Sequence, residues 1–437
     1  MNRTFIHFVS ILFLVGIHLN LTGQISNTVI HSARIEPEAA GFSSVRLKNT
    51  DQLIQSWIGK GYMNGAVALV IRDGKVAYYK AFGYDNIEKK KPFELNTIFR
   101  IASQTKAITS VAVMMLFEEG KFLLDDKIGD YIPEFSNAQV LVKFNSADSS
   151  YTTRPAKRQV TIRDLLTHTS GIGYAQIGTN EQNAIYAKHG VVAGIGVNRI
   201  YLADKMKILG RLPLFHDPGA EWTYGLNTDL LGYLVEVVSG MSLDDFFRKK
   251  IFQPLGMNDT YFYLPPEKHS RLATLYSEGD NGKLRVTENP YKLNGDMNPD
   301  FPATEGTYYS GGGGLSSTIL DYAVFLQMLL NGGQYNGKRI LSSNSVRMMT
   351  SNQIGDMKLW GDENSKFGLG FGITTEKGAG VMPQQAGSYE WGGMFATTYW
   401  VDPKERMVAL FYRNIFPTSH GGLSDKFKVQ VYQAIDK

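Results

Sequence analysis

Two groups of β-rich segments, one near each end of the chain, constrain the fold more than any other feature of the sequence. Near the N-terminus, residues 65–71 and 75–82 flank Asp73-Gly74, and Asp-Gly between two β-rich runs is a strong hairpin signal. Near the C-terminus, three further β-rich segments follow at residues 389–390, 397–401 and 407–412. We expect the two groups to meet in one sheet-containing lobe, although more than 300 residues separate them.

The region between these groups has mostly helical periodicity. Residues 227–239 carry apolar side chains at helical spacing and are followed by Gly240, which predicts an amphipathic helix capped by Asn227 or Thr228. Short strands are expected only at 140–144 and 159–161. At 437 residues the chain exceeds the size of a single compact core. We therefore predict one two-lobed domain over residues 24–437: an α/β lobe of about 36–135 plus 306–437, and an inserted helical lobe of about 136–305.

The N-terminus has the features of a secretory signal. Arg3 precedes a mostly apolar run over residues 8–21, which is shorter than a membrane span and contains His18 and Asn20. This pattern favours a cleaved signal peptide over residues 1–23 rather than an anchor. We expect a bacterial periplasmic or secreted protein with no stable membrane span after cleavage.

Composition excludes several classes of function. The net charge is only +4 and no run of five or six like charges occurs, which argues against a nucleic-acid partner. The chain has no cysteine, so disulfides, thiol nucleophiles and cysteine-based metal sites are excluded. No histidine has a partner at metal-ligand spacing, and the glycine run 311–314 lacks the Lys-Ser/Thr ending of a phosphate-binding loop. We therefore predict neither a metal nor a cofactor. The sequence carries no signal for the oligomeric state.

A Ser-x-x-Lys spacing precedes a long apolar segment. Ser103 and Lys106 lead into residues 107–116, and in a helix residues three apart lie on the same face. A hydroxyl beside an amine is a potential nucleophile and base. A chain of this length contains about one or two such matches by chance, however. The alternative is that Ser103 only caps the helix and Lys106 is solvated.

A serine nucleophile needs a base, and the sequence offers few. No Gly-x-Ser-x-Gly motif occurs, which argues against the Ser-His-Asp triad of an α/β-hydrolase. His168 lies in a tight polar turn, where a structural role is expected. The remaining candidates are Lys106, provided that its surroundings lower its pKa, and a tyrosine. Tyr224 precedes a predicted helix and could project into a cleft, but with 23 tyrosines a packing role is the alternative.

Five ordered segments together carry a resemblance to a known family. They are Ser103-x-x-Lys106, TIRDLLTHTSGIGY from Thr161, YGLNTDLLGYLVE from Tyr224, GGGGLSSTILDYAVFLQMLLNGG from Gly311, and WGGMFATTYWVDP from Trp391. Over about residues 40–415 the chain resembles the serine β-lactamase and penicillin-binding-protein-like hydrolases. It is most similar to the β-lactamase-related carboxylesterases of esterase family VIII. The resemblance implies an α+β fold, with an antiparallel sheet flanked by helices and an inserted, mainly helical lobe.

The resemblance also implies roles for individual residues. Ser103 would be the acylated nucleophile, with Lys106 and Tyr224 sharing the general-base work. The backbone N–H groups of Ser103 and Met394 would form the oxyanion hole.

Substrate contacts would come from the segment Trp391-Gly392-Gly393 and from Leu226. At these positions the chain departs from penicillin-recognising relatives. Those relatives carry an asparagine at the position of Leu226, whereas the asparagine of this chain, Asn227, comes one residue later. They also carry a cation and a hydroxyl at the positions of Trp391 and Gly392. Losing a cationic partner of a buried charged ligand typically costs several kcal/mol. We therefore expect a carboxylesterase that cleaves neutral esters.

Other functions remain open at this point. The same fold could serve a β-lactamase, a D-amino-acid peptidase or an acyltransferase. A non-catalytic binding protein is a further alternative, although the intact Ser103, Lys106 and Tyr224 argue against it. In each catalytic case the partner is a small-molecule ester or amide.

Overall fold

A computed structural model describes residues 28–30, 35–175, 177–192, 194–197, 199–287, 291–292 and 296–436. The predicted signal peptide, residues 1–23, lies outside this range. Within the described residues, the largest sheet has eight strands in the order β14-β15-β16-β17-β18-β1-β2-β3, and every neighbouring pair is antiparallel. Its strands are β1 (Gly65–Arg72), β2 (Lys75–Asn86), β3 (Lys91–Pro92), β14 (Ser365–Phe367), β15 (Gly372–Thr374), β16 (Tyr389–Gly393), β17 (Thr397–Asp402) and β18 (Met407–Tyr412).

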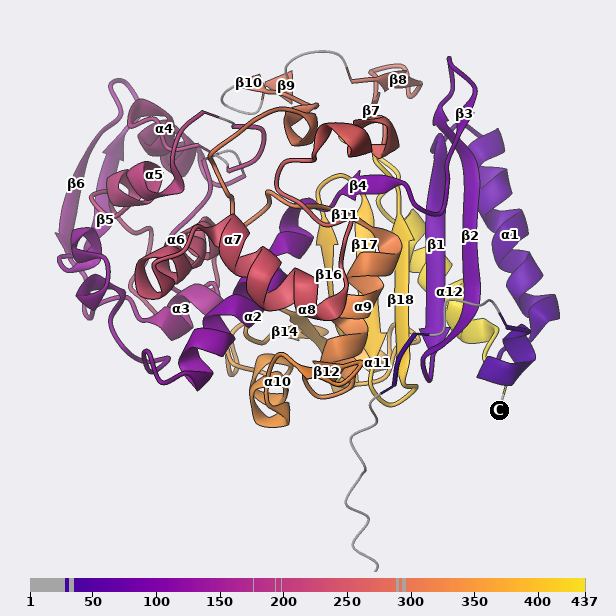
Figure 1. Cartoon of the computed structure of the whole chain (residues 1–437). Coiled ribbons are helices and arrows are strands. Elements are labelled where there is room, and N and C mark those ends of the chain that lie inside the picture. Colours follow the sequence, from indigo (N-terminus) through magenta and orange to yellow (C-terminus); the bar gives the residue numbers. More distant parts are fainter. Residues whose placement is uncertain are drawn as a thin grey trace, which may run out of the picture.

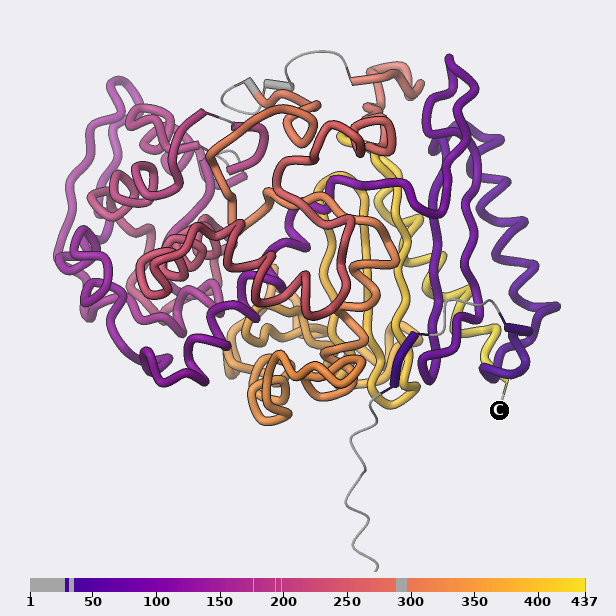
Figure 2. Tube along the Cα trace, viewed as in Figure 1, coloured from indigo at the N-terminus to yellow at the C-terminus, as the bar shows by residue number. Residues whose placement is uncertain are grey.

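The two ends of the chain meet in this sheet as predicted. β1 and β2 form the hairpin, and Asp73 and Gly74 at its turn have φ angles of 54° and 72°. β1 pairs on its other side with β18, where Val67 lies opposite Tyr412. The indigo N-terminal strands and yellow C-terminal strands accordingly run side by side in Figure 2.

Helices cover both faces of the sheet because its central strands are apolar on both sides. On one face, Ala68, Trp400 and Phe411 pack with α1 (Ser44–Gly59) and α12 (Leu423–Gln433). On the other, Val67 and Leu410 pack with α2 (Thr105–Glu118) and α9 (Ile319–Leu330). Figure 1 shows α1 and α12 on the outer side of the sheet and α9 on the side facing the rest of the molecule. Alternating residues thus divide the core into two layers.

The inserted lobe lies beside the sheet and is mainly helical (Figure 1). Its elements are β5 (Gln139–Asn145), β6 (Ser150–Pro155), α3 (Ile162–Leu166), α4 (Asn180–Lys188), α5 (Leu202–Leu209), α6 (Asn227–Ser239), α7 (Leu243–Phe247) and α8 (Gln253–Leu255). Four short strands follow before residue 305: β7 (Tyr276–Glu278), β8 (Leu284–Val286), β9 (Tyr291–Lys292) and β10 (Asp296–Met297). β7 and β8 contact the sheet instead of the lobe, because Tyr276 forms a bridge with Ile415 and packs in the core that contains α1 and α12. β5 was predicted, but its partner was not. β6 occupies part of the segment expected to be a loop, while Thr161, expected in a strand, caps α3.

Several short elements complete the fold. They are β4 (Ile98–Arg100), β11 (Ser316–Thr318), β12 (Gln334–Tyr335), β13 (Lys338–Arg339), α10 (Ser343–Met349) and α11 (Glu376–Ala379). β4 pairs with β11 outside the large sheet. Among the described residues, no helix is long and apolar enough to cross a membrane.

The helix α2 lies where the lobes meet. Most of its residues are buried, and it packs against α6 and α7 of the inserted lobe. It is therefore covered by both parts of the molecule, and its N-terminal end carries the Ser-x-x-Lys spacing.

Candidate active site

Ser103 lies at the entrance to α2, in a short 3-10 turn over Ala102–Gln104. Ala102 has a φ of 43°, in the left-handed region that residues with a side chain rarely adopt. Ser103 itself is half-buried, whereas its neighbours Ala102 and Gln104 are buried. The tight turn therefore leaves the serine as the accessible residue of this stretch, and backbone strain of this kind is common at functional sites.

Lys106 is almost completely buried behind Ser103. Only 2% of its surface is exposed, and its Nζ lies 3.3 Å from Ser103 Oγ. It also donates hydrogen bonds to the Tyr174 hydroxyl at 2.9 Å and to the Gly312 carbonyl oxygen at 2.6 Å. The alternative of a solvated lysine beside a capping serine is therefore wrong, since Lys106 is buried and Ser103 caps no helix.

Two tyrosines approach Lys106 in different ways. Tyr224, the predicted partner, presents its ring face, with the ring centroid 4.7 Å from Lys106 Nζ. Its hydroxyl instead accepts a hydrogen bond from Trp391 Nε1 at 3.4 Å. The hydroxyl that contacts Lys106 belongs to Tyr174, in the loop after α3. Reasoning from the sequence missed Tyr174, although it ends the segment that starts at Thr161, because nothing in that segment indicates which side chain reaches Lys106.

The surroundings fix the protonation of Tyr174 and His168. Burial, followed by the neighbouring Tyr224 and Asp229, raises the pKa of Tyr174 well above its usual range. Burial and the charge of Lys106 hold the pKa of His168 well below its usual range. His168 Nδ1 is 2.9 Å from Asn227 Nδ2. Tyr174 therefore stays a neutral phenol and His168 a neutral imidazole at ordinary pH.

Strand β16 passes directly beside the Ser103 turn. A Cβ added to Gly393 would lie 2.3 Å from the Ile101 carbonyl oxygen, so only glycine permits this approach. Met394 follows β16 in a turn closed by the Ala396 N–H and the Gly393 carbonyl at 3.0 Å. In the turns, loops and caps of the described residues, the N–H groups of Ser103 and Met394 donate to no backbone oxygen. Both are therefore candidates to donate to a substrate oxygen.

One side of the site consists of packed aromatic rings, here called the aromatic wall: Trp222, Tyr224, Trp360, Phe367 and Trp391. Trp360 packs edge-on against Trp222 at 4.7 Å, and Phe367 packs in the same manner against Trp391 at 5.3 Å. Tyr224 links the two pairs, at 5.5 Å from Trp360 and 5.7 Å from Trp391 between ring centroids. Trp391 was predicted to contact the substrate. Trp360, in a turn, and Phe367, the last residue of the short strand β14, were missed.

The structure contradicts the predicted substrate contact at Leu226. Its side chain is fully buried in the main core, directly before the first residue of α6, and presents no surface to a ligand. Asn227, one place later, is also buried, and its side chain bonds the turn that contains Ser170 and Ile172. α6 covers the predicted residues 227–239, but its cap residue is Leu226 and not Asn227 or Thr228, and both Leu226 and Asn227 are buried.

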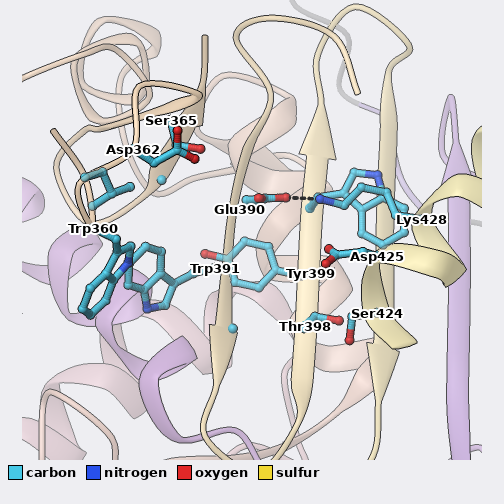
Figure 3. A pocket seen from close by; sticks show the side chains of 14 residues that line it. Trp360, Asp362, Ser365, Glu390, Trp391, Thr398, Tyr399, Ser424, Asp425 and Lys428 are labelled. Carbon is cyan, nitrogen blue, oxygen red and sulfur yellow. Dashed lines mark hydrogen bonds and ion pairs between the residues drawn. The ribbon is translucent and has the colours of Figure 1, made fainter. Parts of the chain in front are cut away.

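A cavity of about 290 Å³ opens beside the aromatic wall, on the sheet face that carries α12. Trp360 and Trp391 line one end, and Gly392 contributes to its surface (Figure 3). At the opposite side, the ion pair between Glu390 and Lys428 connects β16 to α12 (Figure 3). Ser103 and Lys106 do not line this cavity. Trp391 lines it and also packs on Tyr224, whose ring lies against Lys106. No cluster of described residues could hold a metal ion.

A buried carboxylate that the sequence did not reveal lies behind Lys106. Asp229, in the first turn of α6, is fully buried and accepts a hydrogen bond from Ser310 Oγ at 2.6 Å. The available signal was an acidic residue in the first turn of a mostly apolar helix. Lys106 contacts Ser103 and Tyr174, and Lys106, Tyr174 and Asp229 are all buried.

Comparison with known proteins identifies the family of the chain. The model of the Beta-lactamase family matches residues 50–433. Esterase EstB of Burkholderia gladioli is 29% identical, over 92% of this chain and 99% of its own. A putative D-alanyl-D-alanine carboxypeptidase of Escherichia coli K12 is 30% identical, over 86% of this chain and 84% of its own.

A solved structure shows the same fold. EstCE1, described as a hydrolase with promiscuous acyltransferase activity, superposes with a TM-score of 0.77 at 26% identity, over 89% of this chain and 98% of its own. The family match spans most of the chain, and its relatives include esterase and peptidase homologues. The protein is therefore a serine hydrolase that belongs to the Beta-lactamase family.

Proposed function

We propose that the protein is a carboxylesterase that cleaves neutral esters through an acyl-enzyme on Ser103. The observation that carries this proposal is the buried Lys106 amine, 3.3 Å from Ser103 Oγ and held by Tyr174 and Gly312. A base at this distance can accept the serine proton without a large movement.

The acylation step follows from this contact. Lys106, as the neutral amine, takes the Ser103 proton while Oγ attacks the ester carbonyl carbon. The N–H groups of Ser103 and Met394 stabilise the resulting oxyanion. Lys106 then returns the proton to the leaving alcohol as its C–O bond breaks.

Deacylation reverses these roles. Lys106, together with Tyr224, takes a proton from a water molecule that attacks the acyl carbon. Ser103 leaves with that proton, and the carboxylic acid product is released.

The aromatic wall supports a neutral substrate. Trp391 and Gly392 stand where penicillin-recognising relatives carry a cation and a hydroxyl. Tryptophan rings favour apolar and planar groups and leave a ligand carboxylate unpaired. We therefore expect esters of short or moderate acyl chains to be better substrates than β-lactams or D-alanyl peptides.

An active-site probe and a substrate comparison test the proposal. A fluorophosphonate should label the wild type at Ser103 and leave Ser103→Ala unlabelled. kcat/KM should be highest for a short p-nitrophenyl ester and far lower for nitrocefin and an acyl-D-Ala-D-Ala peptide. A preference for either of the latter would overturn the esterase assignment, and a Ser103→Ala variant with full turnover would overturn the mechanism.

Transfer to an alcohol is a measurable variant of the same chemistry. EstCE1 is described as having promiscuous acyltransferase activity. Adding a primary alcohol to the ester assay and quantifying the new ester against free acid separates a hydrolase from an acyltransferase. We expect free acid to dominate.

We also propose that the protein is exported, because residues 8–21 have the composition of a signal peptide core. N-terminal sequencing of the protein from its native cells should find a start near residue 24. A mature protein that retains Met1 would contradict this proposal.

A further inference from the structure

Asp229 is a buried acid with no part in the steps described so far. Its side chain is fully shielded from solvent, at the start of α6. Burying a carboxylate without compensation is strongly unfavourable, so its neighbours must stabilise it or take up its charge.

The nearest compensating groups surround both Asp229 and Lys106. Ser310 Oγ donates to Asp229 Oδ1 at 2.6 Å. A Cβ placed on Gly312 would lie 2.3 Å from Asp229 Oδ2 and 3.5 Å from Lys106 Nζ. The two charged atoms therefore lie within about 6 Å of each other, a range in which opposite charges shift each other's pKa. The absence of a side chain at Gly312 permits this approach, while its carbonyl oxygen binds Lys106 at 2.6 Å.

The other groups that face this pair are neutral. Tyr174 keeps its proton because burial raises its pKa, and the nearby Tyr224 and Asp229 raise it further. Burial and Asp229 raise the pKa of Tyr308 in the same way. His168 remains uncharged because burial and Lys106 lower its pKa. Asp229 is thus the acidic group placed to balance a charge on Lys106.

The charge of Lys106 in turn affects the pKa of Asp229. Burial raises its pKa above the usual value, whereas Ser310, Lys106 and the Gly312 amide oppose this shift. The carboxylate is therefore stabilised most when Lys106 carries a proton.

We propose that Asp229 is a positioning residue that acts through Lys106: its carboxylate is the counter-charge for the ammonium that forms when Lys106 takes the Ser103 proton. This inference rests on the proposed Ser103 acylation. It gives the site a nucleophile, a base and a supporting acid, with Lys106 in contact with Ser103 and close to Asp229. The supporting acid makes Lys106 a stronger base, because a buried opposite charge stabilises the ammonium.

The consequence is a specific change in the pH dependence of acylation. Without the carboxylate the ammonium on Lys106 is less stable, so the neutral amine is favoured. The acid limb of the rate profile should then move to lower pH by about one unit or more. A weaker base also lowers the limiting rate at high pH, by roughly threefold to tenfold.

The test is the rate of Ser103 labelling by a fluorophosphonate between pH 5 and pH 10, with Asp229→Asn compared with the wild type. Labelling reports acylation alone, so water activation does not enter. We expect the acid limb of the rate profile to lie at lower pH in Asp229→Asn than in the wild type. The limiting rate at high pH should also be lower. A reduced rate with an unmoved limb would show that Asp229 is merely structural and would overturn the inference, as would a limb at higher pH.

Two further variants keep the test decisive. Ser310→Ala removes the hydroxyl that favours the ionised carboxylate and should shift the limb in the same direction by a smaller amount, even if Asp229→Asn folds poorly. Asp245→Asn removes a half-exposed acid on α7 and should leave the profile unchanged. A wild type that is not labelled at any pH would refute the proposed function, whereas a labelled wild type with equal limbs in all variants would refute only the role of Asp229.

Discussion

The two sides of the serine site are held together by different forces. On the base side, Lys106, Tyr174 and Asp229 are buried and joined to their neighbours by directional hydrogen bonds of 2.6 to 2.9 Å. On the aromatic wall, contacts are between rings, with one long hydrogen bond from Trp391 to Tyr224. Trp360, at the outer end of the wall, is 64% exposed.

This difference suggests that the base side carries out the reaction and that the aromatic wall selects the substrate. Directional bonds in a buried site specify one arrangement of nucleophile and base, and a small displacement there is costly. Ring contacts tolerate several arrangements, so the wall can admit acyl groups of different shape. Substitutions on the base side should therefore change kcat, whereas substitutions on the wall should change KM and substrate preference.

The largest effect is expected at Lys106. Lys106→Met keeps the length of the side chain but removes the base, which should lower kcat for a short p-nitrophenyl ester by about 10²- to 10⁴-fold with little change in KM. Thermal unfolding should confirm that the variant folds. Lys121→Met, at an exposed position after α2, is the matched control and should keep full activity. A loss of less than tenfold in Lys106→Met would mean that another group is the base.

Of the two tyrosines near Lys106, the one with more access to the cleft should affect kcat more when its hydroxyl is removed. Tyr224→Phe should lower kcat by about 10²-fold, because Tyr224 is half-buried and its hydroxyl can reach a water or a leaving group. Tyr174→Phe should lower it only about tenfold, because Tyr174 is buried and keeps its proton, so it orients Lys106 without exchanging protons. The reverse ranking, measured with the same ester, would move the base-sharing role to Tyr174.

Trp391 should affect binding more than chemistry. Trp391→Ala removes a ring that packs on Tyr224 and Phe367, and should raise KM for apolar esters by roughly tenfold while changing kcat less. Trp391→Phe preserves a ring and should lie near the wild type. If Trp391→Ala lowers kcat and leaves KM unchanged, the aromatic wall takes part in the reaction. That result would contradict the separate roles of the base side and the aromatic wall.

The smallest effect is expected at Trp360. This residue has a φ of 54° in a turn closed by the Asp362 N–H and the Leu359 carbonyl. Trp360→Gly loses ring contacts but relieves about 1–2 kcal/mol of backbone strain, so the free energy of unfolding should change by less than about 1 kcal/mol. KM for a long acyl ester should change a few-fold more than KM for acetate esters. Equal KM values for both esters would remove Trp360 from the wall that selects substrates.

Local chemistry was predictable from the sequence, and tertiary contacts were not. The contact between Ser103 and Lys106 follows from helical spacing within six residues. The hairpin at Asp73-Gly74 follows from the conformational preference of that pair. Tyr174 and Asp229 lie within the segments that start at Thr161 and Tyr224, but they join the site through the packing of separate loops and helices, which the segments alone do not reveal.

Two errors have a physical cause. Leu226 was assigned to the cleft from its place in a motif, but α6 begins directly after it and packs it into the core. The short strands β14 and β15 contain three residues each, too few for a periodic pattern. In both cases the local structure depends on the segments that pack against or pair with these residues, rather than on the residues themselves.

The central claim is that Ser103 forms an acyl-enzyme in a site whose wall accepts neutral esters. The most direct test is rapid-quench mass spectrometry of the protein mixed with a short p-nitrophenyl ester. We expect a mass increase equal to one acyl group, located on the peptide that contains Ser103 and absent in Ser103→Ala. Ester turnover by the wild type with no covalent acyl group at any time point, or with the acyl group on another residue, would contradict it.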